Sequence, residues 1–354
     1  MLSRSWLLLL ARSILAQRSD IILPDLNFDF PVSHHPVQFN ISVHQSFLDF
    51  TARKVRDYRP TRSFSEDWSL EGPPENRVAD VAKYWSTNYD WGAVEQRMNY
   101  ELDHYATTVP GNGNYLLPIP LHFIHQRANK IDGIPLLLLH GWPSSYLEWS
   151  KVIKPLAQYP DQPFHIVAPD LPGFGFSPAP TGPGLGPREM GRAFDSLMHQ
   201  LGYERYGIVT TDLGWFTGMW MVYDVQESIL GHMTDFFVVP PNATDRERLA
   251  KSEASREEIA YIAASDEWYT RHWAYASVHG QKPLALSLSL ADSPVGVLGW
   301  YWDINHATSD GYQYSHEQLI TDAMMLWISG PYSNIRAYLE VFKVHGSSHD
   351  FVRR

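Results

Sequence analysis

The residue best placed to do chemistry is Asp212, a carboxylate at the end of a short apolar run. Residues 206–209 are predicted to form a buried strand, Gly214 follows the carboxylate, and residues 215–228 have helical character. Such a strand–turn–helix corner can hold one side chain above the edge of a sheet. An Asp there can act as a covalent nucleophile, because the following helix stabilises its ionised form. The alternative is that Asp212 only caps this helix, as Asp often does.

Strands and helices alternate on both sides of Asp212 and would position it. Continuous apolar runs with turn residues at their ends predict buried strands at residues 135–140, 164–170, 206–209 and 232–239. Helical spacing predicts helices between them, at residues 144–157, 187–201 and 215–228. This alternation is typical of a doubly wound α/β sheet.

Two loops follow the carboxyl ends of predicted strands, the edge at which open α/β sheets bind their ligands. They are HGWPSS at residues 140–145 and PDLPGFGFS at residues 169–177. The pair Gly173 and Gly175 resembles the start of a dinucleotide-binding fingerprint, but no third glycine follows in register. The nucleotide-binding interpretation is therefore rejected.

The N-terminal part of the chain falls outside this alternation. Residues 24–130 are rich in aromatic and turn residues, with helices predicted at 78–85 and 90–105 and a strand at 121–124. Residues 1–20 contain a short apolar run interrupted by Arg, too short to span a bilayer as a helix. They are either a weak signal or an interfacial anchor that would bring the protein to a membrane, or a plain extension.

Residues 241–318 interrupt the alternation a second time. They begin with a charged helical stretch at 245–264 and continue into a region rich in Trp and Tyr, before helix resumes at 317–338. An insertion of this size after a strand predicts a lid over the catalytic edge. The alternative is an ordinary helical layer packed on the core.

The composition narrows the classes of function. The chain has 354 residues, 44% of them apolar, which is enough for a large folded domain. Its net charge of −11 and the lack of a basic stripe make nucleic acid a poor candidate partner. The chain contains no cysteine, which excludes disulfides, zinc–thiolate sites and a cysteine nucleophile.

Five segments, in this order, resemble the epoxide hydrolases of the α/β-hydrolase fold, in the microsomal and fungal branch with its own N-terminal extension. They are KYWSTNYDWGAVEQRMN (83–99), HGWPSSYLEW (140–149), PDLPGFGFS (169–177), ADSPVGVLGW (291–300) and GPYSNIRAYLE (330–340). The resemblance implies an α/β-hydrolase core with a predominantly parallel sheet. It places this core at residues 131–240 and 319–354, an N-terminal wrapping segment at 24–130 and a helical lid at 241–318.

The resemblance also implies a role for each site residue. Asp212 would attack an epoxide carbon and form an ester, which water then hydrolyses to a diol. Tyr275 and Tyr338 would donate hydrogen bonds to the epoxide oxygen, although each is alternatively a packed core aromatic. The backbone N–H groups of Trp142 and Leu213 would form an oxyanion hole. The resemblance implies no metal or organic cofactor, and a sizeable apolar epoxide as substrate, by analogy one from a natural-product pathway.

The sequence departs from the family at two places. Thr210 and Thr211 stand where the family has glycines, and a β-branched residue at a strained corner is expected to cost energy. In the family, two further strands carry a charge-relay carboxylate and a base histidine, and this chain ends about where the first of them would begin. His345 and His349 stand in a different context and are expected to be solvated. The core is therefore predicted to be incomplete at its C-terminus and water activation to be impaired.

Three interpretations remain open. They are an epoxide hydrolase in which another group replaces the base, a non-catalytic relative that binds an apolar ligand, and a truncated chain that folds poorly. A haloalkane dehalogenase also uses an Asp nucleophile but lacks the N-terminal extension, and Asp212 itself excludes a serine esterase. Incubation with an epoxide separates the first two, which predict either an adduct on Asp212 with little diol or saturable binding without an adduct.

Overall fold

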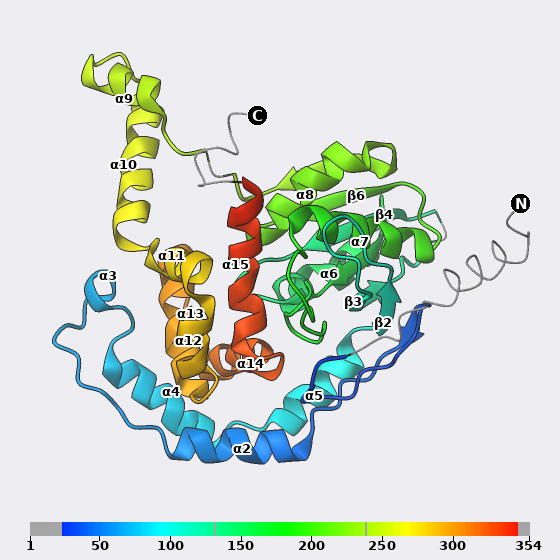
Figure 1. Cartoon of the computed structure of the whole chain (residues 1–354), viewed down its shortest axis with the longest axis horizontal. Helices are drawn as coiled ribbons and strands as arrows, with labels where there is room; N and C mark the ends of the chain where they lie inside the picture. Colours follow the sequence, from blue (N-terminus) through cyan, green and yellow to red (C-terminus); the bar gives the residue numbers. More distant parts are fainter. Residues whose placement is uncertain (1–22, 131, 238, 346–354) are drawn as a thin grey trace, which may run out of the picture.

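A mixed β-sheet organises the chain (Figure 1). The computed structural model describes residues 23–130, 132–237 and 239–345. Within these residues the sheet has seven strands, in the order β1-β2-β3-β5-β4-β6-β7. The strands are β1 Val37–Gln38, β2 His104–Val109, β3 Ile119–Gln126, β4 Ile134–Leu139, β5 Phe164–Pro169, β6 Tyr206–Thr210 and β7 Ile229–Thr234.

The strand directions confirm the α/β class and correct one expectation about it. Strands β5, β4, β6 and β7 run parallel to one another, whereas β1, β2, β3 and β5 are joined in antiparallel pairs. The sheet is therefore mixed rather than predominantly parallel, because the N-terminal strands add an antiparallel edge. Leu137, Leu138 and Leu139 of β4 are buried, as expected of a central strand covered on both faces. Strand β7 lies earlier in the chain than the predicted strand at 232–239.

Helices that follow the strands pack on this sheet. They are η1 Tyr146–Trp149, α6 Ser150–Ala157, α7 Pro187–Gln200, α8 Asp212–Asp224 and η2 Gln226–Ser228. Helix α6 contacts β3 and β5, while α8 contacts β4, β6 and β7. Helix α8 begins at Asp212 itself, earlier than the predicted start at residue 215.

The N-terminal region forms helices along one side of the molecule (Figure 1). They are α2 Gln45–Arg56, α3 Trp68–Glu71, α4 Glu75–Thr87 and α5 Trp91–Glu101. The predicted helix at 90–105 is too long, because Leu102 is extended, with φ −133° and ψ 152°. The chain then enters β2, where β-branched residues favour a strand.

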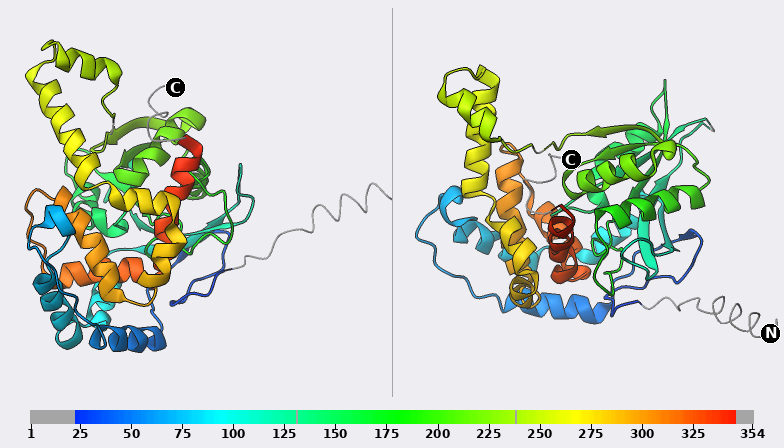
Figure 2. Two further views of the ribbon diagram at one scale, coloured as in Figure 1. Left: turned by 60° about the vertical axis from the view of Figure 1, so that its left-hand side comes forward. Right: turned by 45° about the horizontal axis from the view of Figure 1, so that its top comes forward.

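The chain after β7 is mostly helical. Its helices are α9 Ala243–Ala250, α10 Arg256–Arg271, α11 Ala274–Gln281, α12 Pro283–Leu290, α13 Pro294–Thr308, α14 His316–Ile328 and α15 Pro331–His345. The predicted helix at 245–264 is split, because Ser255 caps α10 through a bond from the Glu258 N–H at 3.2 Å. Helices α11 and α12 pack on α15, which lies between them and the sheet, whereas α9 and α10 project from the body (Figures 1 and 2).

The helix predicted at 317–338 is interrupted between α14 and α15. Gly330 adopts a φ of +84°, which favours glycine, and Pro331 begins the new helix. The Ser333 hydroxyl in the first turn of α15 donates to the Gly173 carbonyl at 2.7 Å. This bond ties the start of α15 to the loop after β5.

The N-terminal helices are tied to the elements that follow the sheet. The Trp327 indole N–H of α14 donates to Thr51 Oγ1 of α2 at 2.9 Å, and both side chains are buried. Lys54 of α2 pairs with Asp292, just before α13, at 2.5 Å. The N-terminal region is therefore tied to α14 and to the segment that leads into α13.

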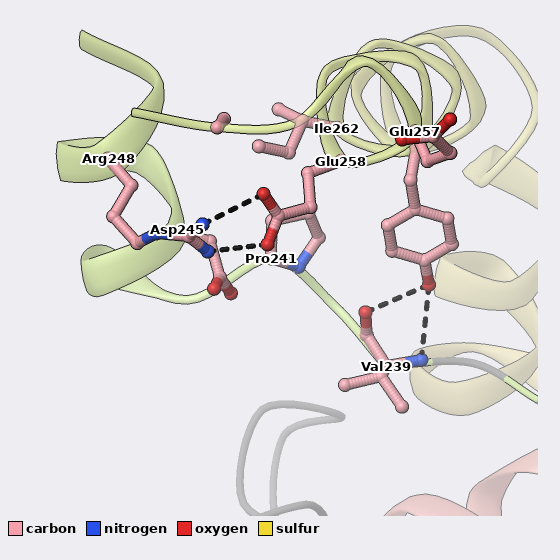
Figure 3. Close-up of a pocket in the computed structure, with 9 residues that line it drawn as sticks. Val239, Pro241, Asp245, Arg248, Glu257, Glu258 and Ile262 are labelled. Atoms are coloured by element: carbon pink, nitrogen blue, oxygen red, sulfur yellow. Dashed lines mark hydrogen bonds and ion pairs between the residues drawn. The ribbon is translucent and has the colours of Figure 1, made fainter. Parts of the chain in front are cut away.

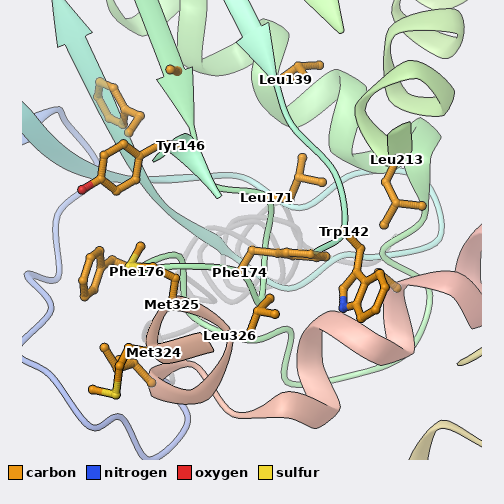
Figure 4. Packing of buried hydrophobic residues seen from close by; sticks show 14 of the residues in the cluster. Leu139, Trp142, Tyr146, Leu171, Phe174, Phe176, Leu213, Met324, Met325 and Leu326 are labelled. Carbon is orange, nitrogen blue, oxygen red and sulfur yellow. The ribbon is translucent and has the colours of Figure 1, made fainter. Parts of the chain in front are cut away.

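The buried core extends from the sheet into the loops at its carboxyl edge (Figure 4). Phe174 and Phe176 of the loop after β5 are fully buried, and so is Tyr146 of η1. Leu326 of α14 belongs to the same cluster. These loops are therefore rigid parts of the core, which suits them to hold a site.

The candidate signal or anchor segment, residues 1–20, lies outside the described residues. Among the helices that the structure describes, none combines the length and the apolar character needed to cross a bilayer.

Candidate active site

Asp212 occupies a strained corner between β6 and α8. Its φ is +45°, in the left-handed region that residues other than glycine seldom adopt. Thr211 is the N-cap residue of α8, and Asp212 is the first helical residue. The interpretation of Asp212 as a helix cap is therefore wrong. Its side chain remains half-buried at the corner rather than sealed in the core.

Two glycines allow this corner to close against the loop after β4. A Cβ on Gly214 would lie 2.4 Å from the Leu139 carbonyl oxygen. A Cβ on Gly141 would lie 2.1 Å from the Oδ1 atom of Asp212. Because no carbon tolerates such contacts, the carboxylate reaches this position only with glycine at both sites.

The threonines before Asp212 do not strain the corner. Thr211 is extended, with φ −137° and ψ 158°, a conformation that suits a β-branched residue. Thr210 ends β6, and its Oγ1 lies 2.8 Å from His232 Nε2. The prediction that the threonines cost energy at this corner is wrong, because Asp212, and not Thr211, adopts the left-handed backbone conformation.

Backbone amides surround the Asp212 carboxylate. The Trp142 N–H donates to Asp212 Oδ1 at 2.7 Å. Burial raises the pKa of Asp212 to about 7, although hydrogen bonds from the Leu213 and Trp142 amides work to lower it. The two amides predicted to form an oxyanion hole therefore both act on this carboxylate.

The two predicted tyrosines come together beside this carboxylate. Tyr275 on α11 and Tyr338 on α15 have ring centroids 5.8 Å apart. The Trp142 ring stacks on Tyr275 at 5.1 Å and lies 6.2 Å from Tyr338. Burial raises the pKa of both phenols above the ordinary value, and the charge of Asp212 raises it further. Both phenols therefore stay protonated and can donate hydrogen bonds at neutral pH.

A buried asparagine, which the sequence analysis did not find, orients this group. The Trp142 indole N–H donates to Asn334 Oδ1 at 3.2 Å, and Asn334 Nδ2 donates to the Leu326 carbonyl at 3.3 Å. Asn334 lies four residues before Tyr338 on α15, so the two side chains share one face of the helix. Its position four residues before Tyr338 could have drawn attention to Asn334. Its partner, Trp142, is too distant in the sequence for the contact to be inferred.

A second missed network holds the two site loops together. Asp170, at the end of β5, is fully buried and accepts hydrogen bonds from the N–H groups of Tyr146 at 2.8 Å and Phe176 at 2.9 Å. His122 Nδ1 lies 2.7 Å from Asp170 Oδ2. Burial works to raise the pKa of Asp170, but the bond from His122 and its charge hold it below the ordinary value. A buried carboxylate thus fastens the loops after β4 and β5 to β3.

The late histidines remain untested. His349 lies outside the described residues, and His345 is the last residue of α15. That both are solvated stays a prediction. In the described part of the chain, no three His, Asp or Glu side chains gather in an arrangement that would hold a metal ion.

A pocket of about 340 Å³ lies on the projecting arm, away from Asp212 (Figure 3). It lies between α9 and α10. Its polar groups already bind one another, since Arg248 donates to both oxygens of Glu258 and Tyr261 bonds with the Val239 backbone. We therefore do not assign it to the active site.

Comparisons with known proteins identify the family of this chain. Residues 36–149 match the family described as "Epoxide hydrolase N terminus", and residues 134–329 match the alpha/beta hydrolase fold. A putative epoxide hydrolase of Stigmatella aurantiaca is 30% identical over 316 residues, which cover 85% of this chain and 68% of that protein. The juvenile hormone epoxide hydrolase of Bombyx mori is 30% identical over 331 residues, which cover 86% of this chain and 70% of that protein.

Solved structures show the same fold. The crystal structure of the Bombyx mori juvenile hormone epoxide hydrolase has a TM-score of 0.76 at 24% identity, covering 93% of this chain and 83% of that chain. The Aspergillus niger epoxide hydrolase has a TM-score of 0.72 at 24% identity, covering 89% of this chain and 82% of that chain. This chain belongs to the epoxide hydrolases of the α/β-hydrolase fold.

Proposed function

We propose that this protein opens the ring of an apolar epoxide by attack of Asp212 and releases a diol after hydrolysis of the ester. The proposal rests on the Asp212 carboxylate, which is held by the Trp142 amide at 2.7 Å beside two protonated phenols. An epoxide needs this combination, because it must receive an electron pair at carbon while its oxygen takes up negative charge.

The first step forms a covalent ester. The Trp142 amide holds one carboxylate oxygen of Asp212, and the other oxygen attacks an epoxide carbon. The bond from this carbon to the ring oxygen breaks, and the oxygen keeps the electron pair. Tyr275 and Tyr338 donate hydrogen bonds to the alkoxide as it forms, and these bonds strengthen as its charge develops. One phenol passes its proton to the alkoxide, which becomes a hydroxyl, and the phenol regains a proton from water.

The second step hydrolyses the ester. Water adds to the ester carbonyl carbon, and the carbonyl oxygen becomes negative where the amides of Trp142 and Leu213 can stabilise it. The bond between this carbon and the diol oxygen then breaks, and the leaving oxygen takes up the remaining proton of the added water. The Asp212 carboxylate is restored and the diol is released. A base that takes the proton of the water accelerates this step.

Epoxide consumption tests the proposal. The protein is incubated with a small aryl epoxide, and loss of epoxide and appearance of diol are followed by chromatography. The wild-type protein is expected to consume at least one equivalent, and Asp212→Asn none. Saturable binding without epoxide consumption by the wild type would instead favour a relative that only binds an apolar ligand.

A further inference from the structure

His279 is a polar side chain in the tyrosine cluster that the proposed mechanism does not use. It lies on α11 four residues after Tyr275, so both project from the same face of the helix. Its ring is fully buried, with centroid distances of 4.7 Å to Trp142, 5.0 Å to Tyr338 and 5.5 Å to Tyr275. A fully buried imidazole therefore borders the group that faces Asp212.

One hydrogen bond fixes the tautomer of this ring. The Trp300 indole N–H donates to His279 Nε2 at 2.9 Å. Because an indole can only donate, Nε2 must offer its lone pair, and the neutral ring carries its proton on Nδ1. Burial lowers the pKa of His279 to about 3, so the ring stays neutral. His279 is therefore a hydrogen-bond donor and does not offer a free lone pair for use as a base.

The donor of His279 has no partner among the described residues. Its Nδ1 atom is buried and makes no hydrogen bond to any described residue. A buried unpaired donor destabilises a fold, so we expect a ligand or a water molecule to complete it. Such a ligand must present an acceptor atom.

The epoxide oxygen is not the expected acceptor. In the proposed function, on which this inference rests, Tyr275 and Tyr338 both donate to that oxygen, and its two lone pairs are then filled. We propose that His279 Nδ1–H binds a second acceptor oxygen of the substrate, an ether, ester or carbonyl oxygen near the epoxide ring. His279 then selects oxygenated epoxides over hydrocarbon epoxides of the same shape.

A matched pair of ligands isolates this contact. Phenyl glycidyl ether and 4-phenyl-1,2-epoxybutane differ only in an ether oxygen that replaces a methylene group. Dissociation constants are measured by tryptophan fluorescence in the Asp212→Asn background, which cannot be alkylated. The protein with His279 intact is expected to bind the ether more tightly by about fivefold, the size of one neutral hydrogen bond.

Two substitutions separate the donor from the packing. Gln at position 279 can place an acceptor near Trp300 but removes the Nδ1–H donor, whereas Asn keeps an amide donor near the Nδ1 position and loses the acceptor. His279→Gln is expected to abolish the preference for the ether, and His279→Asn to retain most of it. Trp300→Phe removes the indole donor that fixes the proton of His279 on Nδ1, so it is expected to weaken the preference for the ether. This variant provides a second test if His279→Gln lowers the yield of folded protein.

The inference is overturned if the intact protein binds both ligands equally, or if His279→Gln leaves their ratio unchanged. An equal loss of affinity for both would assign His279 to the shared epoxide oxygen or to packing. Failure of the proposed function is a separate result, because it would appear as no alkylation of a protein that retains Asp212. The ratio of dissociation constants does not depend on that reaction.

Discussion

Asp212 combines a left-handed backbone, partial burial and a direct bond from a backbone amide. Each property serves a nucleophile more than it serves stability, since strained and partly desolvated groups persist where the surrounding structure enforces them. Desolvation also makes an ionised carboxylate more reactive, because fewer water molecules must leave before it attacks.

The rate of alkylation is expected to depend on pH. Attack requires the ionised carboxylate, and burial raises the pKa of Asp212 to about 7. Protonation therefore inactivates the nucleophile below this pH, and the rate should rise between pH 5 and pH 8 with a midpoint of about 7. Single-turnover kinetics with an aryl epoxide measure the profile. A midpoint near the ordinary aspartate pKa of 3.8 would contradict the environment described for the carboxylate.

Removing either phenol should slow alkylation without unfolding the protein. Tyr275→Phe and Tyr338→Phe each delete one donor to a developing alkoxide, and a hydrogen bond to a charged group corresponds to a loss of roughly 10- to 100-fold in rate. Tyr312→Phe, at an exposed site, is the matched control and should leave the rate unchanged. Equal alkylation rates in all three variants would show that Tyr275 and Tyr338 act only as packed aromatic residues.

The site residues differ in how well the sequence predicts them. The roles of Asp212, Tyr275 and Tyr338 were assigned from the resemblance to a family, although only Tyr338 lies in one of the five matching segments. The structure places the two tyrosine rings 5.8 Å apart, centroid to centroid. Asn334 and Asp170 were missed, because each is defined by a partner from a distant part of the chain. Their burial and bonding become visible only in the folded protein.

The sequence predicted which segments form strands and helices more reliably than it predicted where these elements begin and end. Three strands appear nearly as predicted, at 135–140, 164–170 and 206–209. Each is a continuous apolar run, which is typical of a strand in a sheet that is covered on both faces. The helix predicted at 90–105 failed at its end, where Leu102 continues the helical spacing but leads into β2. The break at Gly330 was also missed, although Gly-Pro marks a helix boundary.

At the scale of the element, the corner between β6 and α8 is predicted to require glycine at position 214. Gly214→Ala places a methyl group 2.4 Å from the Leu139 carbonyl, so it should destabilise the protein by about 1–3 kcal/mol. It should also displace Asp212 and lower the alkylation rate. Urea denaturation and single-turnover kinetics measure the two effects.

The matched control lies in α13. Gly299→Ala meets no atom within 4 Å and is also helical, so it should be neutral or stabilise by about 0.5–1 kcal/mol through helix propensity. If both substitutions had the same effect, the close approach at the corner would not be what requires glycine at position 214.

At the scale of the whole molecule, the N-terminal helices pack on helices that follow the sheet in sequence. Helix α2 contacts α13, and α4 contacts both α13 and α14. Helix α14 in turn contacts α15, which carries Tyr338 and Asn334. The geometry of the site therefore depends on contacts between residues more than two hundred positions apart in the sequence.

The buried bond between Thr51 and Trp327 tests this packing. Thr51→Val keeps the shape of the side chain but leaves the indole N–H without an acceptor, which should cost about 1–3 kcal/mol. Thr87→Val makes the same change at an exposed position and should cost less than about 0.5 kcal/mol. Chemical denaturation measures both. A Thr51→Val protein as stable as the control would mean that the bond between α2 and α14 does not stabilise the protein.

Mass spectrometry of the peptides released from the alkylated protein tests the central claim most directly. The protein is mixed with an aryl epoxide, quenched within one turnover and digested. We expect a mass increase equal to that of the epoxide, located on the peptide that carries Asp212 and absent in Asp212→Asn. Epoxide consumption with no covalent adduct at any time, or an adduct on a residue other than Asp212, would contradict the claim that this carboxylate is the nucleophile.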